Sequence, residues 1–70
     1  MMPLAMIEKG EKRSIVKVKG KDDTRKFLES LGFVEGSEVT VVSEIAGNMI
    51  VNVKNTRVAI DKSMALRIIV

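Results

Sequence analysis

The stretch FLESLGFVEGSEVTVV, residues 27–42, changes its apolar spacing half-way along. Its first part completes a helical pattern at i, i+3, i+4 and i+7, formed by Thr24, Phe27, Leu28 and Leu31. Its last part alternates as a strand does and places Val39 and Val41 on one face. A helix is therefore expected to end, and a strand to begin, within this stretch.

Gly32 and Gly36 form the predicted structural turn between the two elements. At the C′ position of the helix, Gly32 can adopt the left-handed conformation that closes the last turn. Phe33 then follows at C″ and can pack on Leu28. Gly36 is expected to supply a second positive φ where the chain enters the strand. At the other end of the helix, Asp22, Asp23 and Thr24 are all suitable N-cap residues.

The rest of the chain reads as short strands and tight turns. Strands are predicted at 14–19, with Val16 and Val18 on one face, and at 38–42, 49–53, 58–60 and 66–70, the last carrying Ile68 and Val70. Turns are predicted at 45–48 and 54–57, and a single helical turn at 61–65 with Asp61 as its cap. The apolar residues 3–7 are expected to cover one end of the core. The prediction is a single, mainly β domain over residues 1–70: a small five-stranded barrel with one short accessory α-helix.

The composition limits the sites that this chain can build. It contains no cysteine and no histidine, which excludes disulfides, thiolate zinc and imidazole ligands. A metal site would need carboxylates, from Asp22 and Asp23 or from Glu35 and Glu38, and helix capping is the better explanation for the first pair. Of the five methionines, Met1 and Met2 are the terminus, and Met6, Met49 and Met64 fit apolar positions and are better explained as core filling. We therefore assign no metal ligands and predict no cofactor. Direct binding of Fe²⁺ stays open as an alternative, but no ligand residues support it.

The charge is uneven, because residues 1–26 hold eight Lys and Arg and four Asp and Glu, a net +4. A basic segment can mark a nucleic-acid partner. Here most of the cations alternate along a strand, as on an ordinary solvated face, and both aromatic residues, Phe27 and Phe33, are expected on the buried side of the helix. We therefore predict no nucleic-acid partner, but a nucleic-acid-binding module remains the alternative.

Catalysis and membrane insertion are not predicted. Without His or Cys, no serine has a standard base, and residues 20–24 lack the first glycine of a phosphate-binding loop. No apolar run approaches the ~20 residues that cross a bilayer, and the first residues do not resemble a signal peptide. We expect a cytoplasmic protein that is a monomer or a weak oligomer.

The order of these features resembles the FeoA family of bacterial ferrous-iron uptake. The resemblance is carried by Pro3-Leu4 and Gly10, by Leu31-Gly32-Phe33 with Gly36, by Arg57-Val58-Ala59-Ile60, and by Ala65 with Ile68-Ile69-Val70. Many members have proline where this chain has Glu35, which leaves the turn less constrained. The resemblance implies an SH3-like barrel, so the alternative function is that of an SH3-like nucleic-acid-binding or metalloregulator-associated module. It also implies association with FeoB, the membrane transporter of Fe²⁺ that carries a cytosolic G domain.

These expectations define a non-enzymatic accessory protein that acts by protein–protein contact. The candidate contact residues lie in the lead-in, near the helix and its turn, or are arginines that could stabilise charge during GTP hydrolysis by the partner: Leu4, Met6, Ile7, Phe33, Arg13, Arg25 and Arg57.

Overall fold

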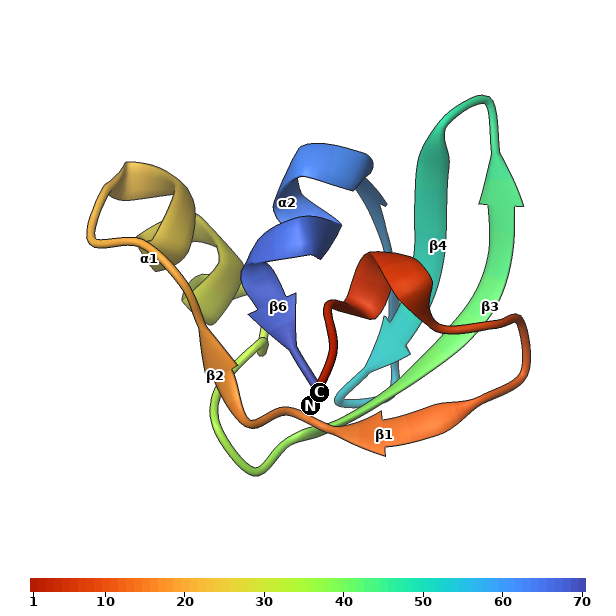
Figure 1. Cartoon of the computed structure of the whole chain (residues 1–70), viewed down its shortest axis with the longest axis horizontal. Helices are drawn as coiled ribbons and strands as arrows, with labels where there is room; N and C mark the ends of the chain where they lie inside the picture. Colours follow the sequence, from red (N-terminus) through yellow and green to blue (C-terminus); the bar gives the residue numbers. More distant parts are fainter.

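The chain folds as two antiparallel sheets with three short helices around them (Figure 1). The computed structural model describes all residues, 1–70. One sheet has the strand order β1-β3-β4-β5, with β1 (Lys12–Ser14), β3 (Glu38–Ile45), β4 (Asn48–Val53) and β5 (Thr56–Asp61). The other pairs β2 (Lys17–Val18) with β6 (Ile68–Ile69). The helices are the 3₁₀ turn η1 (Leu4–Met6), α1 (Asp23–Ser30) and α2 (Lys62–Arg67).

The predicted strand at 14–19 is wrong, because the chain changes sheets in its middle. The N–H of Ile15 donates to the carbonyl of Ser37 (2.8 Å), whereas the N–H of Val16 donates to that of Ile69 (2.7 Å). The break changes the side-chain phase: Ile15 and Val18 are buried and Val16 is partly exposed. Six strands therefore replace the predicted five.

Both predicted hairpin turns are confirmed, and both have the same backbone geometry. Ala46 and Gly47 have φ of 50° and 83°, and Lys54 and Asn55 have φ of 49° and 62°. Two successive positive φ values define a type I′ turn, whose twist matches that of the flanking strands. β3 extends beyond the predicted strand at 38–42, to Ile45, and its register with β4 shifts at a bulge between Val41 and Ser43.

The C-terminal part differs from the predicted strand at 66–70. Asp61 caps a helix as predicted, since its Oδ1 accepts from the N–H of Met64 (2.8 Å). This helix, α2, continues through Leu66 and Arg67, so that β6 holds only Ile68 and Ile69. The molecule therefore has a second short α-helix, α2, in addition to the predicted α1.

A single hydrophobic cluster fills the space between the sheets and the helices. η1 closes one end of it through Leu4, which is fully buried, as expected for the lead-in. The buried members come from every element except β1: Leu4, Ile7, Ile15, Val18, Leu28, Phe33, Val39, Val41, Met49, Val51, Val53, Ile60, Ala65, Ile68 and Val70.

The two ends of the chain lie side by side (Figure 1). Met2 and Val70 exchange two backbone hydrogen bonds, of 2.9 and 2.8 Å. Pro3 forms an antiparallel bridge with Ile69. The first residues thus extend the small β2–β6 sheet.

Candidate interaction surfaces

The turn after α1 has the backbone geometry expected from its two glycines. Gly32 has a φ of +109°, and the N–H groups of Gly32 and Phe33 donate to the carbonyls of Glu29 (3.0 Å) and Leu28 (3.1 Å). This pair of bonds is a Schellman motif, and Phe33 and Leu28 are both fully buried. Gly36 has a φ of +87°.

The same turn is attached to the point where the chain changes sheets. The N–H of Gly36 donates to the carbonyl of Ile15 (2.8 Å), and the N–H of Ile15 donates to the carbonyl of Ser37. Since β1 pairs with β3 and β2 pairs with β6, these bonds fix the turn against the junction of the two sheets.

An ion pair that the sequence analysis missed joins the start of α1 to the end of α2. Asp22 is the N-cap of α1 and accepts from the N–H of Arg25 (3.3 Å). Its two carboxylate oxygens also accept from the guanidinium of Arg67, at 2.7 and 3.0 Å. The hydrogen bond from Arg67 lowers the pKa of Asp22 to about 2, and the pKa of Arg67 is raised in turn. No local pattern could reveal this pair, because its members lie 45 positions apart.

The three candidate arginines differ in their surroundings. Arg13 is paired with Glu11 (2.9 Å), and Arg25 donates to the carbonyl of Gly20 (3.0 Å) and lies 3.7 Å from the carboxylate of Glu29. Arg57 is exposed on β5 and forms no ion pair. Arg57 is therefore the one of the three whose charge is unpaired.

Three of the apolar candidates for partner contact are core residues. Leu4, Ile7 and Phe33 are all buried, because the first two anchor η1 and its exit and the third closes the Schellman motif. Their side chains are not available to a partner in this structure. Met6 is different: it projects from η1 with 64% of its surface exposed, so the expectation that it fills the core is wrong.

The expectation that both aromatic residues are buried is wrong for Phe27. In α1 only Leu28 is buried, and Phe27 is 50% exposed. One aromatic side chain is therefore half-exposed at the surface, so the lack of an exposed aromatic residue no longer counts against base stacking. The sequence analysis also missed Ile45, which is 61% exposed, and Leu66 on α2, next to η1.

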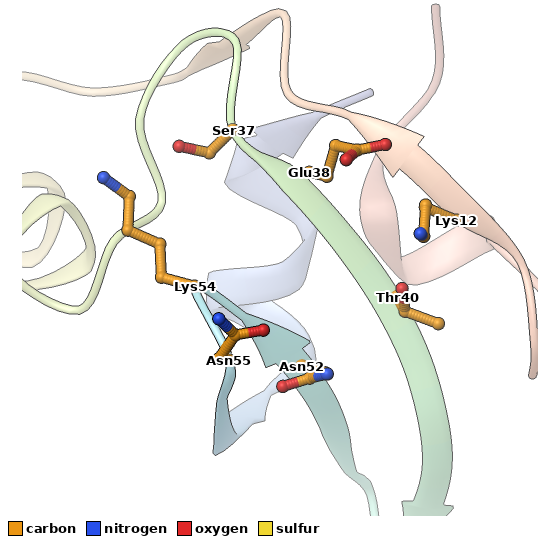
Figure 2. Close-up of a pocket in the computed structure, with 7 residues that line it drawn as sticks. All are labelled: Lys12, Ser37, Glu38, Thr40, Asn52, Lys54 and Asn55. Carbon is orange, nitrogen blue, oxygen red and sulfur yellow. The ribbon is translucent and has the colours of Figure 1, made fainter.

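The outer face of the large sheet carries a shallow polar depression of about 310 Å³ (Figure 2). Cross-strand pairing places Lys12 opposite Thr40, Thr40 opposite Asn52, and Asn52 opposite Arg57. No apolar side chain lines the depression; its residues are Lys12, Ser37, Glu38, Thr40, Asn52, Lys54 and Asn55. Small-molecule sites are usually apolar pockets with a few polar groups, so this face is suited to polar contact rather than to enclosing a ligand.

The acidic residues do not gather into a metal site. No group of three or more Asp or Glu side chains could hold an ion, and Asp22 is already engaged by Arg67 and the start of α1. The oxygen donors that remain suit hard cations such as Mg²⁺ and Ca²⁺ better than transition metals. In addition, none of the helices is both long enough and apolar enough to cross a bilayer.

Comparison with known proteins gives consistent results. The FeoA domain family matches residues 2–70. A Methanocaldococcus jannaschii protein that carries the name Fe(2+) transport protein A is 30% identical over 70 residues, which are all of this chain and 85% of that protein.

Solved structures agree with the sequence comparison. The crystal structure of an iron uptake regulatory protein (FeoA) superposes with a TM-score of 0.88 and 31% identity, over 96% of this chain and 89% of that one. Stenotrophomonas maltophilia FeoA, crystallised with zinc and described as a procaryotic SH3 domain protein, gives a TM-score of 0.87 and 28% identity, over 99% and 88%. The fold is thus the predicted SH3-like barrel, and the chain belongs to the FeoA family.

Proposed function

We propose that this protein is a cytoplasmic accessory protein of ferrous iron uptake that binds FeoB through its cytosolic G domain. The observation that carries the proposal is the match to the FeoA domain over residues 2–70. In this role the protein catalyses no reaction and holds no resident metal; Fe²⁺ is the cargo of the transporter.

The titratable groups support a role in binding rather than in chemistry. Shifted pKa values occur at Asp22, Asp61 and Arg67. Asp22 and Asp61 cap helices, and Arg67 pairs with Asp22, so each shift has a structural cause. A general acid or base would instead need a pKa moved toward the working pH.

We place the contact at η1 and the neighbouring helix α2. Leu4 and Ile7 fix η1 from the inside, so that Met6 is held outward on a rigid support. η1 packs against α2, which exposes Leu66. Methionine is enriched at protein interfaces relative to the rest of the surface, so Met6 is the anchor that we propose for this contact.

Titration calorimetry with the purified FeoB G domain tests this proposal. The wild-type chain is expected to bind, and Met6→Glu is expected to weaken binding at least about tenfold, the equivalent of 1.4 kcal/mol. Ile45→Glu is the matched control, because Ile45 is similarly exposed but lies at the tip of the β3–β4 hairpin. No binding by the wild-type chain would refute the proposal, and equal weakening by both variants would refute the position of the contact.

The same samples test the arginine hypothesis. A guanidinium supplied by a partner accelerates GTP hydrolysis by stabilising transition-state charge. Arg57 is the candidate with an unpaired charge. If the hydrolysis rate of the G domain is unchanged at saturation, the protein is a binding partner only.

A further inference from the structure

We propose that the free edge of β5 binds a second copy of this chain, by antiparallel pairing of β5 with β5 centred on Ala59. The large sheets of the two copies then continue into each other. This inference concerns self-association and does not depend on the contact with FeoB.

The outer edge of β5 has no strand beside it. β5 is the last strand of its sheet and pairs only with β4. None of the backbone hydrogen bonds formed outside the helices and strands involves residues 56–61. Arg57, Ala59 and Asp61 are exposed. An open edge of this kind is a template for strand addition.

The type I′ turns determine which backbone groups point outward. In a two-residue hairpin, the residues that flank the turn exchange both hydrogen bonds, and hydrogen-bonded pairs then alternate along the ladder. Thr56 flanks the Lys54–Asn55 turn, so Thr56, Val58 and Ile60 direct their N–H and C=O groups toward β4. The same groups of Arg57 and Ala59, and the N–H of Asp61, therefore point to the free edge. The carbonyl of Asp61, the N-cap of α2, is directed into that helix.

The β3–β4 hairpin gives the same result independently. Its turn is Ala46–Gly47, so Asn48 directs its backbone groups toward β3. Alternation along β4 then directs the groups of Met49 and Val51 toward β5. These residues stand opposite Ile60 and Val58, in agreement with the assignment above.

The residues at this edge also share one face of the sheet. Val58 and Ile60 stand opposite the buried Val51 and Met49, on the core side. Side chains alternate along a strand, so Arg57, Ala59 and Asp61 are on the outer face. Their exposure agrees with this.

The charges favour one register. With Ala59 opposite Ala59 of the second copy, the two alanines exchange both backbone hydrogen bonds, and each Arg57 faces Asp61 of the other copy. Shifting the strands so that Arg57 meets Arg57, or Asp61 meets Asp61, places like charges together, which is destabilising. In the intermediate registers, Arg57 does not stand opposite Asp61 of the second copy.

Both charged groups are free to make this contact. Arg57 has no ion pair within the chain. The bonds that Asp61 accepts from Ser63 and Met64 both end on Oδ1, which leaves Oδ2 for a guanidinium. The β1 edge offers less, because β1 has three residues and its Arg13 is paired with Glu11.

Sedimentation equilibrium from about 10 μM to about 1 mM tests the proposal, over a range suited to a small and weak interface. The apparent mass of the wild-type chain is expected to rise from 7.7 kDa toward twice that value. Arg57→Glu creates two like-charge contacts and is expected to weaken the dimer about tenfold. Arg13→Glu, at the opposite edge of the sheet, is the matched control and is expected to leave the dimer intact. A mass of 7.7 kDa at every concentration would overturn the proposal, as would equal weakening by both variants.

Amide exchange locates the contact without any substitution. The N–H of Ala59 is expected to exchange rapidly in dilute samples and slowly in concentrated ones, because pairing covers it. The N–H of Val58 is bonded to β4 in either state and serves as the internal reference. If the protein dimerises but exchange at Ala59 stays rapid, the dimer uses another surface and the proposal is wrong.

Discussion

The side chain of Lys54 lies across Gly32, so that the loop after α1 touches the turn between β4 and β5. A Cβ built on Gly32 would lie 3.2 Å from Cγ of Lys54 and 3.3 Å from Cδ. Gly32 is therefore constrained twice, by its positive φ and by the lysine stem. Figure 2 shows Lys54 directly after the end of β4, where it also lines the polar depression.

Alanine substitutions separate these two constraints. Gly36→Ala forces a non-glycine residue into positive φ with no atom within 4 Å of the new Cβ, which is expected to cost about 1–2 kcal/mol. Gly32→Ala is expected to lower the free energy of unfolding more, because Lys54 must also move. Gly32→Val is expected to lower it further still. Urea unfolding measures each free energy. Combining Gly32→Ala with Lys54→Ala should recover the excess, and full additivity of the two changes would show that the contact has no energetic effect.

Adjacent residues of α1 are expected to respond very differently to truncation. Leu28→Ala removes a fully buried side chain and should lower the free energy of unfolding by about 2–5 kcal/mol. Phe27→Ala removes a larger but half-exposed side chain, and its expected effect is smaller, at about 1 kcal/mol or less. Urea unfolding of the two variants is the measurement. A cost at Phe27 as large as that at Leu28 would contradict the orientation of the helix.

The Asp22–Arg67 pair should make stability depend on acid pH. The pKa of Asp22 in the folded protein is about 2, below its ordinary value of 3.8. The carboxylate therefore contributes stability above pH 3.8, and the contribution is lost as the pH falls through about 2. Asp22→Asn should accordingly lower the melting temperature near neutral pH, and the difference from wild type should shrink in that acid window.

Asp61 does not disturb this comparison. Hydrogen bonds from Ser63 and Met64 also lower the pKa of Asp61. Its contribution to the stability of the protein is therefore also lost as the pH falls. It is present in both proteins, however, and cancels in their difference. The same comparison is repeated in an Arg67→Gln background. Without the guanidinium, the effect of Asp22→Asn on the melting temperature should depend little on pH. A difference in melting temperature that stays constant with pH would exclude the pair as its source.

The turn between β3 and β4 contains an alanine with a positive φ, and this strain can be relieved by substitution. Ala46 has a φ of 50°, in a region that alanine disfavours and asparagine tolerates. Ala46→Asn produces the preferred Asn-Gly sequence of a type I′ turn and should stabilise the protein by up to about 1 kcal/mol. Thermal unfolding measures the change. Ile45→Asn, one position earlier in β3, has no positive φ to relieve and should give no such gain.

Features determined by neighbouring residues were predictable from the sequence. The Schellman motif closes within Leu28–Phe33, and each I′ turn is set by two residues, so local rules were sufficient. The change of sheet at Ile15 was not predictable, because its hydrogen bonds go to Ser37 and Ile69, which are distant in sequence. An alternating pattern cannot show that a strand exchanges its partner half-way along.

The candidate site was less predictable than the fold. Helical spacing grouped Phe27 with Leu28, but α1 has only eight residues and only Leu28 is buried, so the pattern could not decide how far its apolar face extends. Likewise, Leu4, Ile7 and Phe33 were candidates for contact because they lie in elements added to the sheet, but their side chains are buried in the core. Surface contacts depend on what the core leaves uncovered, which composition does not reveal.

The hydrogen bonds between Met2 and Val70 allow the chain order to be rearranged. A short glycine–serine linker would join these neighbours, and new ends could be opened at the solvent-exposed Ala46–Gly47 corner without removing a core side chain. Such a circular permutant should refold, because the barrel depends on which segments meet and not on the order in which the chain visits them.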